Sequence, residues 1–150
     1  MQTIQALGQD DARRAIAAIR AECAARGVAV VIAVADPQGE LLALLRMDGA
    51  LVSSVGVAIA KAFTAARLRK PSRAVGTASR NPVTGFDVAY YGDPRYVGWA
   101  GGLPVLHDGT VVGAVSVSGL AQDIDEELAE YGVAAIEAAY EIATDTTGVP

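Results

Sequence analysis

The sequence has 150 residues, a length that fits one domain able to bury an ordinary hydrophobic core without disulfides or metals. Its formal net charge of −5 argues against nucleic acid as a partner, because phosphate binding needs a basic face. Hydrophobic residues make up 52% of the chain, but the longest apolar run, residues 28–35, is far shorter than the roughly 20 residues of a membrane-spanning helix, so no membrane partner is expected.

Composition also bears on assembly and location. Much of the apolar excess is alanine and valine, which favours burial between subunits, so we expect a homo-oligomer. The single cysteine, Cys23, cannot form an internal disulfide and is expected to be a small core residue. The first residues show no cationic segment followed by an apolar run, so no signal peptide is predicted and a cytoplasmic location is expected.

The first part of the chain predicts a helix followed by a hairpin. Apolar residues recur at helical spacing over 10–26, and Gly27 supplies the stop. The valine-rich run 28–35 predicts a buried strand, and a tight turn joins it to a partner strand over 40–47. Asp36 opens that turn and is expected to accept backbone amides there.

A second helix and a long loop follow. Ser53 or Ser54 can cap the helix, which is expected to end before Lys70 because a proline comes next. One or two further helical turns are predicted over 72–79. The loop beyond them leaves room for a short strand near 96–99.

A second hairpin completes the strands. Segments 102–107 and 110–118 predict two strands, and the Asp108-Gly109 pair between them is a strong signal for a two-residue turn. Both hairpins have short turns, so their strands are antiparallel, and the helices bracket them instead of alternating with single strands. The order predicts an α+β fold in which N-terminal, central and C-terminal helices pack on an antiparallel sheet.

The final helix and the chain ends complete the prediction. The helix is expected to open at Asp123 or Asp125 and to run to about Ile142. We expect one domain over the whole sequence, with frayed ends at 1–8 and 144–150.

The segment 79–104 has the composition typical of a small-molecule site. It contains the only tryptophan, several tyrosines and a run of glycines, whereas the rest of the chain is small and aliphatic. Rings that carry polar groups, beside glycines that let a ligand approach the backbone, favour a pocket. The alternative is a surface loop whose rings cover the core or a subunit contact.

Four residues of this segment are candidates for ligand contact or proton transfer. Arg95 suits a carboxylate or enolate bound against an aromatic face, and Trp99 lies four residues further on. Tyr90 and Tyr91 are candidate hydrogen-bond donors. We assign Tyr90 and Arg95 to catalysis, and Tyr91 and Trp99 to ligand binding.

Other candidates come from the predicted helix and strands. Lys61 lies in an alanine-rich stretch, where burial would lower its pKa and make it a candidate base or anion anchor. Gly101 and Gly102 can present backbone amides to an oxyanion, although entry into a strand also explains them. Arg46 is a candidate ligand-binding residue, but an internal pair with Asp48 is the favoured interpretation.

The standard catalytic constellations are unlikely. A Ser-His-Asp site would need His107, the only histidine, which is predicted at an exposed hairpin turn. The sequence has no Cys or His cluster for zinc and no glycine-rich nucleotide loop, so no metal site is predicted.

Several motifs follow one another in a characteristic order. They are the run from Gly27 to Asp36, Gly39, Arg46-Met47-Asp48-Gly49, Ala58 to Ala62 with Thr64-Ala65, Gly101-Gly102-Leu103-Pro104, and Val112 to Gly119. In this order they resemble the GlcG/HbpS family, which includes the C-terminal domain of PduO-type proteins, and the similarity runs from about Leu7 to Tyr140.

The resemblance implies a profilin-like fold with a five-stranded antiparallel sheet, and dimers that assemble into tetramers or octamers. It also implies a haem-binding or accessory protein of small-molecule catabolism, with a lysine at the position of Lys61. Haem is therefore a candidate cofactor, but the sequence lacks a histidine at the family's position. Tyr90, Tyr91 or Cys23 would then have to bind the iron, since tyrosinate and thiolate do so elsewhere.

Three functions stay open. The first is a small-molecule-binding protein that takes haem or another planar or anionic organic ligand. The second is a cofactor-independent isomerase, lyase or hydrolase that uses Lys61, Arg95 and a tyrosine for proton transfer; here Lys61→Met should abolish turnover and leave the melting temperature nearly intact. The third is a structural oligomer in which the aromatic loop is a subunit contact.

Overall fold

The computed structural model describes residues 1–147, and these form an α+β domain. Its elements along the chain are α1 (Gln9–Arg26), β1 (Val31–Ala35), β2 (Leu41–Arg46), α2 (Ser53–Leu68), α3 (Ser72–Ser79), the 3₁₀ helix η1 (Val88–Tyr91), β3 (Gly102–His107), β4 (Thr110–Ser118) and α4 (Gln122–Thr147). No helix among these residues is both long and apolar enough to cross a membrane.

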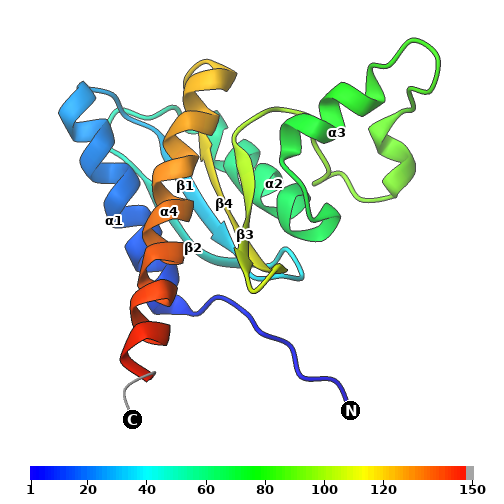
Figure 1. Cartoon of the computed structure of the whole chain (residues 1–150). Helices are drawn as coiled ribbons and strands as arrows, with labels where there is room; N and C mark the ends of the chain where they lie inside the picture. The colour runs from blue at the N-terminus through cyan, green and yellow to red at the C-terminus, as the bar shows by residue number, and fades with distance from the viewer. Residues whose placement is uncertain (148–150) are drawn as a thin grey trace.

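The four strands form one antiparallel sheet in the order β2-β1-β4-β3 (Figure 1). The predicted α+β class is confirmed, but the expected fifth strand is not found within residues 1–147. The segment 96–99 is irregular because its backbone bonds to a helix side chain: Thr64 Oγ1 of α2 accepts from Val97 N and donates to Arg95 O. The profilin-like assignment stays a prediction.

Helices cover both faces of the sheet (Figure 1). On one face, Ile32 and Val34 of β1 belong to a core shared with α1 and α4. On the other face, Ala33 packs with Ala58 and Ala62 of α2. Because both faces are buried, β1 needs apolar residues at every position, which explains the continuous apolar run in the sequence.

The turns agree with the sequence. Gly27 ends α1 in the left-handed region at φ 69°, as glycine does most easily. Asp36 Oδ1 accepts the amides of Gln38 and Glu40, at 2.9 and 3.0 Å, as predicted for that turn. Asp108 also has a positive φ, 47°, and the following glycine has 73°, as the predicted two-residue hairpin turn requires.

The chain ends differ from the prediction. Leu7 is only 3% exposed, and its amide donates to Val112 O at 2.8 Å. The Leu7 side chain packs over Gly113, where a Cβ would lie 2.5 Å from it. Because Leu7 is bonded and packed in this way, the ordered part of the chain begins before α1. At the other end, α4 continues past the predicted stop near Ile142 to Thr147. The rest of the predicted tail, 148–150, lies outside the described residues.

The α1–α4 contact can be tested at Ile19, which is fully buried and packs against Gly132 of α4. Ile19→Ala should lower the free energy of unfolding by about 2–5 kcal/mol, because it leaves a cavity in the core. Ile4→Ala is the control, since Ile4 is 61% exposed and its loss should change stability by no more than about 0.5 kcal/mol. Urea unfolding followed by circular dichroism measures both. Equal effects would contradict this packing.

Candidate functional site

The structure buries an ion pair between α2 and the start of α4. Lys61 is 2% exposed, and its Nζ donates to Asp125 Oδ2 and to Val117 O of β4, both at 2.9 Å. The other carboxylate oxygen, Asp125 Oδ1, accepts the amide of Leu120 at 2.9 Å. These bonds join α2, β4 and α4 at one point, so the buried alternative predicted for Lys61 is the one found.

Burial changes the protonation of Lys61. Loss of water around Lys61 lowers the pKa of its amine, while the hydrogen bond and the charge of Asp125 act in the opposite direction. The net direction is down, so Lys61 gives up its proton more readily than an exposed lysine. The side chain of Asp125 is 3% exposed, and it accepts a hydrogen bond from the Lys61 amine.

Gly101 and Gly102 pack directly against Lys61. Gly101 has φ 123°, and a Cβ there would lie 2.5 Å from Val117 O and 2.9 Å from Lys61 Nζ. A Cβ on Gly102 would lie 2.3 Å from Lys61 O. The Gly102 amide already donates to Ser72 Oγ at 2.9 Å, so it is not presented to a ligand as we expected. The glycines are needed because α2 and this loop are so close.

A cavity of about 320 Å³ opens beside the ion pair; we call it the Lys61 cavity. Trp99 lines it and is 57% exposed, and its role in ligand binding stays a prediction. Its other lining residues are Ser54, Val57, Lys61, Ser118, Gly119, Leu120, Gln122 and Asp125. The cavity therefore combines an aromatic ring, aliphatic walls and a few polar groups, as small-molecule sites do.

Hydrogen bonds fix the loop that carries Trp99. Ser72 Oγ of α3 donates to Trp99 O at 2.6 Å, and Gln122 Oε1 of α4 accepts the Ala100 amide at 3.0 Å. Ser72 and Gln122 were not among the residues predicted for the site, and Asp125 was expected only to open a helix. A carboxylate in the first turn of a helix is so common that its pattern does not indicate a buried partner.

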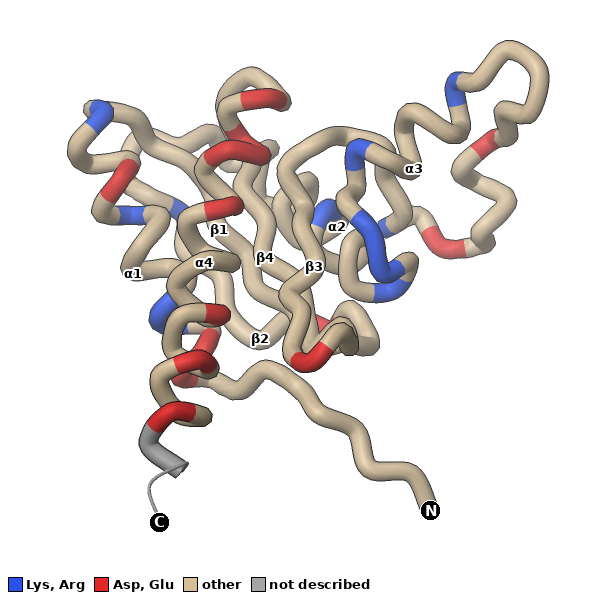
Figure 2. Tube along the Cα trace, viewed as in Figure 1, with Lys and Arg blue, Asp and Glu red and all other residues tan. Residues whose placement is uncertain are grey.

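Charge is distributed unevenly around the cavity. Figure 2 shows acidic residues along α4 and basic residues at the end of α2 and in α3. Arg73 of α3 links the two regions: its guanidinium pairs with Glu126 at 3.0 Å and with Asp123 at 2.5 Å. This contact holds α3 against the first turn of α4, next to the loop of Trp99.

Arg95 lies elsewhere, in a second group of aromatic residues. Its guanidinium carbon is 3.9 Å from the centre of the Phe63 ring, and it pairs with Asp93 at 3.0 Å and Glu40 at 3.3 Å. Because the ion pair with Asp93 is hydrogen-bonded, it raises the pKa of Arg95 and lowers that of Asp93. Arg95 is not among the residues that line the Lys61 cavity.

Tyr90, Tyr91 and Tyr96 also belong to this second group. Tyr91 stacks on Tyr96 with ring centres 4.6 Å apart, and Tyr96 meets the edge of Phe63 at 5.0 Å. Tyr90 is 84% exposed and, with Tyr91 and Phe86, lines a separate cavity of about 330 Å³. A single chain therefore does not bring Lys61 together with the tyrosines and arginine that we assigned to the same chemistry.

Arg46 is not near the Lys61 cavity either. It ends β2 with an exposed side chain and is not a lining residue of that cavity. Within residues 1–147 it forms no ion pair with Asp48, so the pair that we favoured from the sequence is absent.

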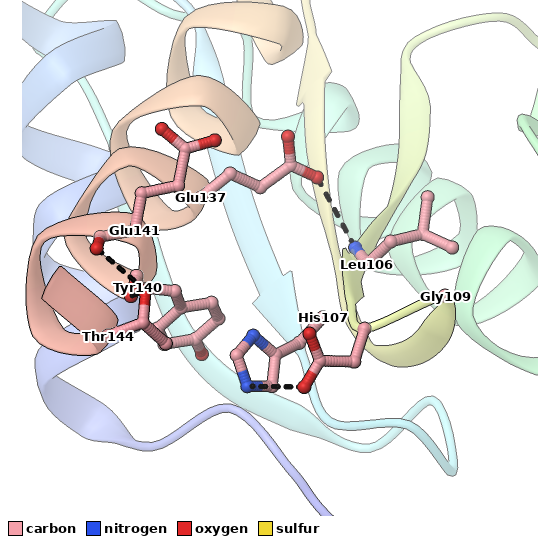
Figure 3. A pocket seen from close by; sticks show the side chains of 8 residues that line it. Leu106, His107, Gly109, Glu137, Tyr140, Glu141 and Thr144 are labelled. Carbon is pink, nitrogen blue, oxygen red and sulfur yellow. Dashed lines mark hydrogen bonds and ion pairs between the residues drawn. The ribbon is translucent and has the colours of Figure 1, made fainter. Parts of the chain in front are cut away.

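His107 is less exposed than predicted. Its side chain is 27% exposed, its ring meets the edge of Tyr140 at 4.7 Å, and its Nε2 is 3.6 Å from Asp108 Oδ2. Figure 3 shows these groups around a cavity of about 320 Å³, with Glu137 and Glu141 on the α4 side. The prediction of an exposed turn failed because α4 extends along the hairpin. Burial raises the pKa of Tyr140 to about 12.

Residues 1–147 contain no group of three or more His, Cys, Asp and Glu side chains placed to hold a metal ion. Cys23 is buried in the core shared by α1 and α4, as predicted, and burial raises the pKa of its thiol. Neither the imidazole nor the thiol reaches the Lys61 cavity.

The fold and cavity define a small α+β domain with an ion pair beneath a ligand-sized opening. The chain belongs to the HbpS-like family, because the model of that family, described as "Haem degrading protein HbpS-like", matches residues 7–134. This confirms the resemblance drawn from the motifs.

Three similar proteins place the chain further. Protein GlcG of Escherichia coli strain K12 is 38% identical over 118 residues, which is 79% of this chain and 85% of that one. The crystal structure of Klebsiella pneumoniae protein ORFY superposes with a TM-score of 0.87 at 30% identity, over 92% of this chain and 95% of that one. The complex of PduOC with haem superposes with a TM-score of 0.80 at 24% identity, over 87% and 94%, and supports the fold alone.

Stability tests the ion pair. Lys61→Met leaves Asp125 buried without its cation and should lower the free energy of unfolding by about 3–5 kcal/mol. The melting temperature should therefore fall, contrary to what the enzyme hypothesis led us to expect from the sequence. The matched double variant Lys61→Met/Asp125→Asn removes both charges and keeps an oxygen for the Leu120 amide, so it should recover most of the loss. If the single variant is as stable as the wild type in urea unfolding, the pair is not buried as described.

Proposed function

We propose that this protein binds a small organic molecule in the Lys61 cavity, through a planar group against Trp99 and an oxygen atom at Lys61. The observation that carries the proposal is the buried Lys61–Asp125 pair beside a cavity with an exposed indole. An ammonium has three N–H groups, and Lys61 has two hydrogen-bond acceptors among the described residues. One N–H group therefore remains for a ligand.

The cavity limits the size and polarity of that ligand. Its volume of about 320 Å³ lies at the lower end of the roughly 300–1,000 Å³ of small-molecule pockets. A molecule with one ring and a carbonyl or carboxylate group suits this space. Ser54, Ser118 and Gln122 add polar contacts at the wall, while Val57 and Leu120 exclude water from the ring.

Haem is the second candidate ligand, because the matching family is described as haem degrading and the similar PduOC structure is a complex with haem. The Lys61 cavity has no histidine, cysteine, methionine or tyrosine in its lining, and these are the usual axial ligands of haem iron. The cavity lined by His107 and Tyr140 also has three carboxylates in its lining, those of Asp108, Glu137 and Glu141. Their negative charge would repel the haem propionates. Neither fits haem.

The cavity of Tyr90, Tyr91 and Phe86 offers an oxygen ligand without a carboxylate in its lining, and its volume of about 330 Å³ would cover part of a porphyrin. It is lined by three rings, and a phenol oxygen is a known axial ligand. Tyr90, the more exposed tyrosine, would hold the iron, and Phe86 and Tyr91 would contact the porphyrin. A bound haem would supply a redox-active iron, whereas the protein residues would orient it and limit access of water.

Catalysis, assembly and location are further proposals. Acid–base catalysis by Lys61 with Arg95 and Tyr90 would need a second chain or a rearrangement, because one chain separates them. A homo-oligomer remains our proposal, as do a cytoplasmic location and the structural role of the aromatic loop. The exposed side chains of Leu41, Leu42 and Leu51 are consistent with contacts between chains.

Ligand binding can be measured with 4-methylbenzoate, which has one ring and one carboxylate. Calorimetric titration should give a saturable signal with the wild type, and Trp99→Ala should weaken binding at least about ten-fold, since loss of an aromatic contact is worth about 1.4 kcal/mol or more. Arg95→Ala is the matched control, because Arg95 is outside the cavity and its loss should leave binding unchanged. No heat of binding with the wild type, or equal weakening in both variants, would contradict the proposal.

Haem binding can be measured by titration with haemin. We expect the Soret band to shift on binding, and Tyr90→Phe should reduce that shift because it removes the phenol oxygen and little else. His107→Ala should leave the shift unchanged. A shift that depends on His107 would place haem in the cavity lined by His107 and Tyr140. No shift at all would remove haem as a ligand of this chain.

A further inference from the structure

We propose that Lys61 forms a covalent imine with a small aldehyde or ketone that enters the Lys61 cavity. This inference rests on the proposed function, since the carbonyl compound is the ligand of the same cavity. It goes further because it assigns a reaction to the site and names the carbonyl group as the reacting part of the ligand.

The position of the Lys61 amine favours this chemistry. The sequence has two lysines, and they differ sharply: Lys61 is 2% exposed and lines the cavity, whereas Lys70 is exposed beyond the end of α2. A lysine attacks a carbonyl only as the neutral amine, and enzymes that use this chemistry place the lysine in an apolar pocket. Val57, Leu120 and Trp99 provide such walls here.

Asp125, which contacts the Lys61 amine, also favours this chemistry. Asp125 Oδ2 is 2.9 Å from Lys61 Nζ and can take its proton directly. Because burial lowers the pKa of Lys61, this transfer is easier than for an exposed lysine. Asp125 is held in place by the Leu120 amide on its other oxygen, so the acceptor stays aligned. The pair therefore works as a nucleophile with its base.

The reaction balances without any further reagent. Lys61 passes one proton to Asp125, and the freed lone pair of Nζ attacks the carbonyl carbon to form a C–N bond. The carbonyl oxygen receives a proton from the nitrogen and a second from Asp125, and it leaves as water when the C=N bond forms. The product is a protonated imine, which pairs with the restored Asp125 carboxylate. Nothing is oxidised or reduced.

The protein itself provides an internal control for the test. Wild-type protein is incubated at pH 7 with 4-carboxybenzaldehyde and sodium cyanoborohydride, which reduces an imine to a stable secondary amine. Tandem mass spectrometry then locates the added mass. Lys61 should be labelled faster than Lys70, because burial lowers the pKa of Lys61 and so raises the fraction of its amine that is neutral.

Two further measurements make the result specific. An excess of 4-methylbenzoate, which has no aldehyde, should protect Lys61 and leave labelling of Lys70 unchanged. Lys61→Arg keeps a cation opposite Asp125 but cannot form the imine, so it should lose the cavity label while the label on Lys70 remains. Its melting temperature shows whether it is folded, but the wild-type labelling ratio decides the proposal without any variant.

The outcomes separate this inference from the proposed function. If 4-methylbenzoate binds by calorimetry and Lys61 is labelled no faster than Lys70, the imine proposal is overturned and the binding proposal stands. If 4-methylbenzoate does not bind and Lys61 is not labelled, both are overturned and the ion pair is a structural link only. Fast labelling of Lys61 that 4-methylbenzoate prevents supports both.

Discussion

The structure depends on a charge pair that links two helices beneath the cavity. Lys61 and Asp125 belong to two helices that pack on different parts of the sheet, and each is almost fully buried. Burial of a single charge is strongly unfavourable, so neither helix can take its place without the other. The pair thus couples the position of α2 to that of α4, and the carbonyl of Val117 accepts from Lys61, which links α2 to β4.

The same constraint explains residues that have no charge. The loop from Trp99 to Gly102 crosses directly over the pair, and its glycines leave the space that any side chain would fill. Ser72 satisfies both the Trp99 carbonyl and the Gly102 amide of this loop. The indole is therefore held at the rim of the cavity by bonds to its backbone, and its side chain remains free to contact a ligand.

The sequence could predict the scaffold because its signals are local. The helical spacing of α1, the apolar run of β1 and the Asp-Gly turn each depend on neighbouring residues, and each is found as expected. Lys61 was found because a lone charge among alanines is unusual. Its partner was not, because Asp125 lies far along the chain and an aspartate at a helix start has a sufficient local explanation. The prediction of a fifth strand was wrong for a similar reason. Thr64 bonds to the carbonyl of Arg95 and the amide of Val97, which a strand at 96–99 would need for its own pairing.

The aromatic residues of the segment 79–104 fall into two separate groups in this arrangement. These groups lie on two different sides of α2. Lys61 forms the ion pair on one side, whereas Phe63, two residues further on, contacts Tyr96 and Arg95. In an α-helix, residues two apart point in very different directions, so the two groups cannot share a cavity within one chain. Trp99 therefore belongs with the lysine, and Tyr90 and Tyr91 belong with the arginine. A ligand that needed both groups would have to bind where two chains meet.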